Sequence, residues 1–64
     1  MTFVNGDFGI SLYVDTNGKY VVKTYKGDKV IQFCEYDSLL HACDKFTQYV
    51  RKHLAEVRTS ILTP

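Results

Sequence analysis

The side chains of this chain that could bind a metal or attack a substrate are those of its two cysteines and two histidines. In sequence order they are Cys34, His41, Cys43 and His53. Zinc modules pair their ligands ~2–4 residues apart, and this run does not follow that pattern. The strand and helix periods described below also turn Cys34 outward while Cys43 faces the core. We therefore predict no metal site and no cofactor, and we interpret Cys43 as a buried free thiol in a reducing compartment.

Other features that catalysis requires are also missing from the sequence. It contains no motif for a serine or cysteine nucleophile, no glycine-rich phosphate loop and no pair of carboxylates that alternation would bring together in a pocket. At 64 residues the chain forms one small domain, 1–64, with little room for a catalytic cleft. Its 45% of apolar and 23% of charged residues are typical of a globular protein. These features predict a protein that is not an enzyme.

Charge and hydropathy restrict the partners and the compartment. The formal net charge is +1, so the chain has neither the strongly basic character of a nucleic-acid binder nor a strongly acidic one. No apolar run approaches the ~20 residues of a membrane span. The opening MTFVNGDFG lacks the charged start and apolar centre of a secretory signal. We therefore expect a cytoplasmic protein, in the host cytoplasm if the gene is viral, without a membrane partner.

The segment FGISLYVD alternates apolar and polar side chains, which predicts a half-buried strand over about 8–15. Two turns fit the residues that follow. One is a two-residue loop at Asn17 and Gly18, and the other is a type I turn from Asp15 to Gly18 with a glycine bulge. We favour the bulged turn, because it pairs Asp15 with Lys19 and keeps the apolar side chains of both strands on one face.

A second hairpin is predicted about Gly27 and Asp28, which completes a three-stranded sheet over about 8–35. It would place Val22 opposite Phe33. One face of the sheet would then be apolar and able to cover a helix, and it would consist of Ile10, Leu12, Val14, Tyr20, Val22, Ile31 and Phe33. The opposite face would be mixed, and it would consist of Tyr13, Lys19, Val21, Lys23, Tyr25, Val30, Gln32 and Cys34.

The segment EYDSLLHACDKFTQYVRKHLAEV predicts an amphipathic helix over about 38–57, with Asp37 or Ser38 as the residue that caps its start. The tail 58–64, RTSILTP, has no period and is expected to be flexible. Near the start of the chain, VNGD would fit a turn from a short extra strand. The predicted fold class is α+β, a three-stranded antiparallel sheet of two hairpins packed on one C-terminal amphipathic helix.

The order of these elements resembles a known arrangement. The stretch GISLYVDTNGKYVVKTYKGDKVIQFCEYDSLLHACDKFTQYV is similar to the sheet and helix of AP2 domains and of the arm-type amino-terminal domains of tyrosine integrases. The resemblance rests on a glycine before the first strand, NGKY leading into the second, and an aromatic-Asp-Ser helix start followed by alanine. The resemblance implies that the outer sheet face binds duplex DNA. On that face this sequence has no arginine, and the whole chain has no tryptophan. The corresponding positions are Tyr13, Lys19, Lys23, Tyr25 and Gln32.

Two classes of partner therefore compete for the outer sheet face. Tyrosines and valines bordered by lysines are typical of a protein interface, and we favour a small adaptor or inhibitor of a host protein, encoded by a phage or mobile element. The residues of that interface would be Tyr13, Val21, Lys23, Tyr25, Val30 and Gln32. The alternative is a duplex-DNA-binding module that uses Lys19, Lys23, Lys26 and Gln32. Self-association as a homodimer through the same face, or by pairing of exposed strand edges, is a third interpretation.

Overall fold

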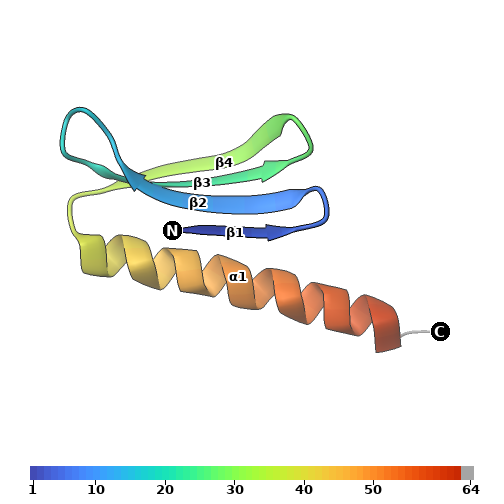
Figure 1. Cartoon of the computed structure of the whole chain (residues 1–64). Helices are drawn as coiled ribbons and strands as arrows, with labels where there is room; N and C mark the ends of the chain where they lie inside the picture. Colours follow the sequence, from blue (N-terminus) through green and yellow to red (C-terminus); the bar gives the residue numbers. More distant parts are fainter. Residues whose placement is uncertain (63–64) are drawn as a thin grey trace.

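A computed structural model of the protein describes the backbone of residues 1–62 and the side chains of residues 1–57. It contains one antiparallel sheet and one helix, in the order β1 (Thr2–Asn5), β2 (Phe8–Val14), β3 (Tyr20–Lys26), β4 (Lys29–Tyr36) and α1 (Leu39–Leu62). Each strand pairs with the next along the chain, so β1 and β4 are the two edges of the sheet (Figure 1). The α+β class and the C-terminal helix are confirmed. The prediction of three strands is wrong, because the sheet has four.

The additional strand is β1, which the VNGD sequence had only suggested. It turns back on β2 at Gly6 and pairs antiparallel with it, with Phe3 opposite Ile10. Gly6 has a φ of +65°, a conformation that glycine adopts without steric cost. With only four residues, β1 is too short for periodicity to identify it, which is why sequence alternation did not find it.

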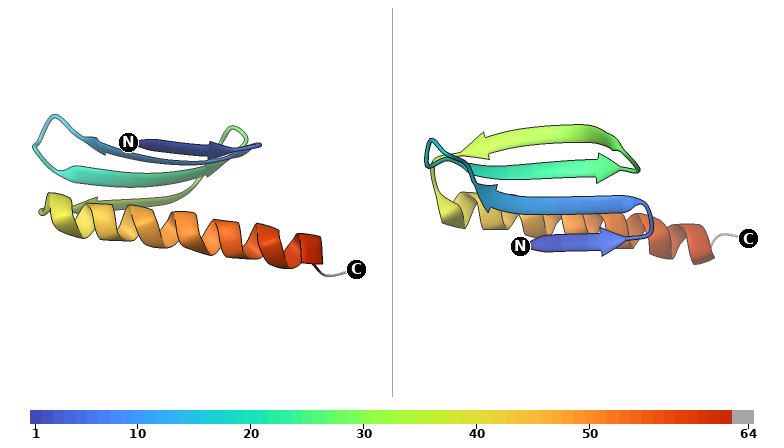
Figure 2. Two further views of the ribbon diagram at one scale, coloured as in Figure 1. Left: turned by 60° about the horizontal axis from the view of Figure 1, so that its bottom comes forward. Right: turned by 45° about the horizontal axis from the view of Figure 1, so that its top comes forward.

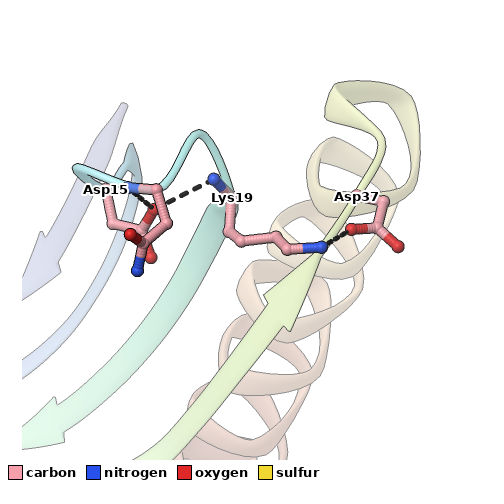
Figure 3. Close-up of polar contacts among 4 residues, drawn as sticks. Asp15, Lys19 and Asp37 are labelled. Carbon is pink, nitrogen blue, oxygen red and sulfur yellow. Dashed lines mark hydrogen bonds and ion pairs between the residues drawn. The ribbon is translucent and has the colours of Figure 1, made fainter.

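The turn between β2 and β3 is the bulged turn that the sequence favoured. The Asp15 amide donates to the Lys19 carbonyl oxygen at 2.9 Å, and the Gly18 amide donates to the Asp15 carbonyl oxygen at 3.1 Å. The Asp15 carboxylate accepts hydrogen bonds from the Asn17 and Lys19 amides (Figure 3). Gly18 has a φ of +79°, as the bulge requires. The predicted pairing of Asp15 with Lys19 is therefore confirmed.

The Lys19 ammonium reaches across the same end of the sheet to the Asp37 carboxylate, just before the helix (Figure 3). This hydrogen bond and the charge of Lys19 lower the pKa of Asp37, and Asp37 in turn raises the pKa of Lys19. Both side chains are open to water, so the pair orients the chain before α1 and contributes little to stability.

The hairpin between β3 and β4 turns at Gly27 and Asp28 as predicted, but its register differs from the predicted one. A bulge between Thr24 and Tyr25 of β3 and the facing residues of β4 shifts the pairing by one residue. As a result Val22 faces Cys34 instead of Phe33. Because side chains alternate along a strand, a shift of one residue moves the rest of β4 to opposite faces. The predicted inward position of Phe33 and outward position of Cys34 are therefore wrong.

The core lies between the sheet and α1, on one face of the sheet only (Figure 2). Its fully buried side chains are Ile10, Val22 and, from the helix, Ala42, with Leu12 beside them. The predicted inner positions of these sheet residues are confirmed. Val14 is also on this face by register but is exposed, because it lies at the end of the sheet. Aromatic and half-buried side chains close the periphery of the core: Phe3, Phe8, Tyr20, Tyr36, Cys43, Phe46, Tyr49 and Val50.

The helix begins at Leu39, with Ser38 as its N-cap. The Ser38 hydroxyl accepts a hydrogen bond from the His41 amide at 3.5 Å, and the Ser38 carbonyl oxygen accepts one from the Ala42 amide at 3.0 Å. Of the two predicted caps, Asp37 is instead held by its ion pair with Lys19. The helix continues to Leu62 and does not end near 57, so most of the predicted tail is helical. The last two residues of that tail lie outside the described residues.

No helix in the described part of the chain is long and apolar enough to span a bilayer.

Candidate functional site

Helix α1 leaves one face of the sheet uncovered (Figure 2). We call it the outer face. Cross-strand pairing assigns its members from all four strands. They are Thr2, Val4, Gly9, Ser11, Tyr13, Val21, Lys23, Tyr25, Val30, Phe33 and Glu35. Figure 2 shows that the helix lies on the opposite side of the sheet, so in the described structure no element covers these residues.

Lys23 lies at the centre of the outer face between two aromatic rings. Its Nζ is 5.4 Å from the centroid of the Tyr13 ring on β2 and 5.8 Å from that of the Phe33 ring on β4. Both distances are within the range of a cation–π interaction. The two rings therefore hold the long side chain of Lys23 across three strands. Among the described residues no carboxylate forms an ion pair with this ammonium.

Val21 lies on the outer face but is not part of its accessible surface. Its exposed fraction is 1%, as low as that of the core residues. Its cross-strand neighbours are Tyr13 on β2 and Glu35 on β4. The prediction that Val21 is an exposed contact residue is therefore wrong. A side chain on a central strand becomes buried when large side chains of the two neighbouring strands pack over it. The alternation of residues in the sequence cannot predict this burial.

Tyr25 packs closely on Gly9, its cross-strand neighbour. A Cβ atom built on Gly9 would lie 2.7 Å from the Cε2 atom of the Tyr25 ring, well inside van der Waals contact. Because Gly9 has no side chain, the Tyr25 ring can pack directly against the Gly9 backbone. Tyr25 is half-buried for this reason and contributes one side of its ring to the outer face.

Gln32 was predicted on the outer face, but the shifted register turns it toward the helix. Its Nε2 donates a hydrogen bond to the Tyr49 hydroxyl at 2.9 Å. Cys34 and Tyr36 follow the same alternation, and Cys34 contributes to raising the pKa of both Tyr36 and Tyr49. The side of β4 that faces α1 is therefore a polar cluster. Phe33, which sequence reasoning placed in the core, is the residue of β4 that joins the outer face.

Burial raises the pKa of Tyr36, and the hydrogen bond and charge of Cys34 raise it further. Burial raises the pKa of Tyr49 in the same direction. In each case the folded protein favours the neutral phenol. The resulting stability is complete below the ordinary tyrosine pKa of 10.0 and decreases as the pH rises from there toward the raised value of the folded state.

We expect Tyr36→Phe to weaken the alkaline loss of stability, because phenylalanine cannot ionise. Between about pH 8 and pH 11 the urea midpoint should fall less for Tyr36→Phe than for the wild type. Tyr13→Phe is the control, since Tyr13 lies on the exposed outer face, and its midpoint should follow the wild type. Equal pH dependence of all three proteins would contradict the burial of the Tyr36 hydroxyl.

A small cleft opens between β4 and the second half of α1. It has a volume of about 240 Å³, somewhat below the ~300 Å³ at which ligand pockets begin. Its walls combine apolar and polar side chains: Phe8, Thr24, Ile31, Gln32, Tyr49, Lys52, His53 and Glu56. At its floor is Thr24, which is 4% exposed and whose hydroxyl has no hydrogen-bond partner among the described residues.

We expect Thr24→Val to raise the free energy of unfolding by about 1 kcal/mol, because it removes a buried hydroxyl without a partner and keeps the side-chain shape. Urea unfolding at neutral pH measures the change. Thr24→Ser is the matched variant that keeps the hydroxyl and loses the methyl group, and it should be less stable than the wild type. A loss of stability in Thr24→Val would mean that the hydroxyl is hydrogen-bonded in solution.

The residues of the predicted DNA-binding set do not gather on one surface. Lys23 lies on the outer face, whereas Gln32 faces the helix. Lys19 is paired with Asp37 at the end of the sheet. Lys26 ends β3 opposite Phe8, and by register it points to the helix side of the sheet. The shifted register of β4 and the turn contacts separate these side chains, although their spacing suggested a common face.

The four candidate metal ligands are also distributed over the molecule. The ring of His41 contacts Tyr36 at the start of the helix, with ring centroids 4.9 Å apart. His53, further along the helix, stacks on Phe8 with ring centroids 3.9 Å apart, and its Nε2 accepts a hydrogen bond from the Asn5 amide group at 3.1 Å. Both cysteines are free. Within the described residues no three side chains of histidine, cysteine, aspartate or glutamate are grouped to hold a metal ion.

His53 has a structural role between the helix and the sheet. Besides stacking on Phe8, its ring meets the ring of Phe3 edge-on at 6.1 Å. Through these contacts one helix residue attaches α1 to both β1 and β2.

Comparison of the chain with protein-family models, curated proteins and solved structures finds no match in any of the three. The resemblance to AP2 and integrase arm-type domains therefore stays a prediction.

Proposed function

We propose that the protein binds another protein through the outer face and modulates that partner by occupying its surface. The observation that supports this most directly is the set of exposed apolar side chains around one fixed lysine. Tyr13, Val30 and Phe33 are each at least one third exposed, and the rings of Tyr13 and Phe33 flank Lys23 on a face that no other described element covers. Aromatic residues around a limited number of charges are typical of protein interfaces.

The charge of the outer face favours a protein over a nucleic acid. By register it contains one cation, Lys23, and one anion, Glu35. Duplex binding normally needs several basic side chains directed to phosphates, and arginine is the usual reader of guanine. A face without net charge provides neither. Stacking of unpaired bases on the rings would still need a positively charged path for the backbone, and the other lysines of the sheet region lie away from this face.

Contacts within the outer face also suit binding. The contacts of Lys23 with two rings and of Tyr25 with Gly9 restrict these side chains before any partner arrives. Ordering an interface side chain on binding costs about 0.5–1.5 kcal/mol, so side chains that are already ordered lose less. The side chains of Lys23 and Tyr25 on the outer face would therefore lose little conformational freedom when a partner binds.

A displayed library of random peptides tests the proposal without knowledge of the natural partner. Selected peptides would be titrated into ¹⁵N-labelled protein, and the amide shifts would be mapped on the structure. We expect the shifts to centre on Tyr13, Lys23 and Phe33. Shifts confined to the exposed helix surface around Lys45 and Lys52, or failure to select any binder, would contradict binding through the outer face.

The duplex-DNA alternative is tested separately by fluorescence anisotropy with a mixed-sequence duplex at ~50 and ~200 mM salt. We expect no binding at tens of micromolar protein. Binding that falls steeply with salt would overturn the proposal in favour of DNA, and Lys23→Gln would then show whether the outer face is the site.

A further inference from the structure

The ammonium group of Lys23 lies among side chains of the outer face without a counter-ion. The rings of Tyr13 and Phe33 flank it from the two neighbouring strands, and the lysine side chain is half-buried between them. Within the described residues no carboxylate forms an ion pair with this group. A ring face attracts a cation but accepts no conventional hydrogen bond from it. The hydrogen bonds of the ammonium are therefore made to water on the uncovered side of the sheet.

Glu35 is the one carboxylate among the outer-face residues. It pairs across the strands with Val21, whereas Lys23 pairs with Phe33, so Glu35 and Lys23 are diagonal neighbours. The Cα atoms of such neighbours are ~7–8 Å apart in an antiparallel sheet, within reach of long side chains. In the described structure Glu35 nevertheless stays exposed and unpaired with Lys23. The sheet thus leaves the ammonium free although a carboxylate is near.

A partner that covers the outer face must also remove water from Lys23. A buried ammonium without a paired group is strongly unfavourable, because it loses its hydration and gains nothing in return. The flanking rings cannot replace the lost hydrogen bonds, so the acceptor has to come from the partner. A carbonyl group would supply a hydrogen bond only, whereas a carboxylate supplies the opposite charge as well. A lysine or arginine of the partner at the same place would be repelled.

We propose that the partner presents the carboxylate of an aspartate or glutamate side chain to Lys23, with apolar residues on both sides of it. The inference rests on the proposed function, since it names the chemistry of the partner that the outer face binds. The apolar residues contact the exposed side chains of Tyr13, Val30 and Phe33. Once they are in place they exclude water from the ion pair, which strengthens it. The occupant is therefore a mainly apolar protein segment with an acidic residue at its centre.

The peptide selection proposed above tests this chemistry through the sequences that it yields. With the wild type as bait, we expect aspartate or glutamate at one position of the selected peptides and apolar residues on both sides. With Lys23→Glu as bait, lysine or arginine should take that position instead. Lys52→Glu is the matched control, because Lys52 is an exposed lysine on the helix, and its peptides should resemble those of the wild type. Far-UV circular dichroism shows that each bait is folded.

A double-mutant cycle then measures the contact itself. The acidic residue of a selected peptide is replaced by its amide, asparagine for aspartate or glutamine for glutamate. This change should lower the affinity for the wild type ~30-fold, and the affinity for Lys23→Met by less than ~3-fold, because methionine keeps an apolar stem without the charge. The Glu35→Gln variant should respond as the wild type does. An effect that appears only in Glu35→Gln would show that Glu35 is the counter-ion of Lys23, and it would overturn the proposal.

The outcomes distinguish this inference from the proposed function. Peptides that shift the outer-face amides but carry no preferred acidic residue would overturn the acidic partner and leave binding through the outer face intact. Equal effects of the amide replacement on the wild type and on Lys23→Met would do the same. A selection that yields no peptide in contact with the outer face would overturn the proposed function, and this inference with it.

Discussion

Val21→Asp is expected to leave the protein largely unfolded at neutral pH. Val21 is 1% exposed, and an aspartate there would have to lose its hydration without an ion-pair partner or shift its pKa and bind a proton. A loss of at least ~3 kcal/mol follows, which is comparable with the whole stability of a domain of this size. Far-UV circular dichroism and urea unfolding measure the effect.

Val30→Asp is the matched control for this variant. It makes the same substitution on the same face, but Val30 is 55% exposed, so its aspartate stays hydrated. We expect it to cost about 1 kcal/mol or less. If the two variants were equally stable, Val21 would not be buried beneath its neighbours, and the outer face would be flatter than the structure shows. Comparing the stabilities of Val21→Asp and Val30→Asp thus shows whether Val21 is buried, because both residues lie on the same face of the sheet.

Phe33→Ala is expected to separate binding from stability. A phenylalanine in a core costs about 3–5 kcal/mol when it is truncated, but Phe33 is 52% exposed and packs mainly against Lys23. We therefore expect a stability loss near 1 kcal/mol. The affinity for peptides selected on the outer face should fall about 30-fold, equivalent to ~2 kcal/mol, as is common for an aromatic residue at the centre of an interface.

Gln32→Ala is the complementary variant, because Gln32 is next in sequence and points to the opposite side of the sheet. It removes the hydrogen bond to Tyr49 and should cost about 1 kcal/mol of stability without changing peptide affinity. The reverse result would be a strong loss of stability in Phe33→Ala and a loss of binding in Gln32→Ala. It would support the register that alternation predicted for β4. Urea unfolding and peptide anisotropy on the same protein samples give both quantities.

Much of the local structure follows from the sequence because it depends on neighbouring residues. The Asp15 carboxylate can reach the amides of Asn17 and Lys19 in a tight turn, and Gly18 supplies the positive φ that the bulge needs. Ser38 caps the helix through contacts within one turn. Once the first turn is assigned, alternation places Ile10 and Val22 in the core. These predictions are correct because each depends on a short stretch of chain.

The face of each β4 residue could not be derived in this way. A bulge needs no special residue, since one extra residue in either strand suffices, and nothing in the β4 sequence marks its position. One shifted residue was enough to exchange Phe33 with Gln32 between the two sides of the sheet. Sequence alternation therefore placed Tyr13, Val21, Lys23, Tyr25 and Val30 correctly on the outer face, but it wrongly placed Gln32 there and left out Phe33.

By itself the sequence determined the α+β class, the positions of the turns, the start of the helix and which side of β2 and β3 faces the core. Only the tertiary structure decided the register of β4, the burial of Val21 on an uncovered face, and the pairing of β1 with β2. The physical reason is the range of the interactions. Turns and caps are selected by hydrogen bonds within a few residues, whereas register and burial depend on which side chains of separate strands pack together once the sheet has formed.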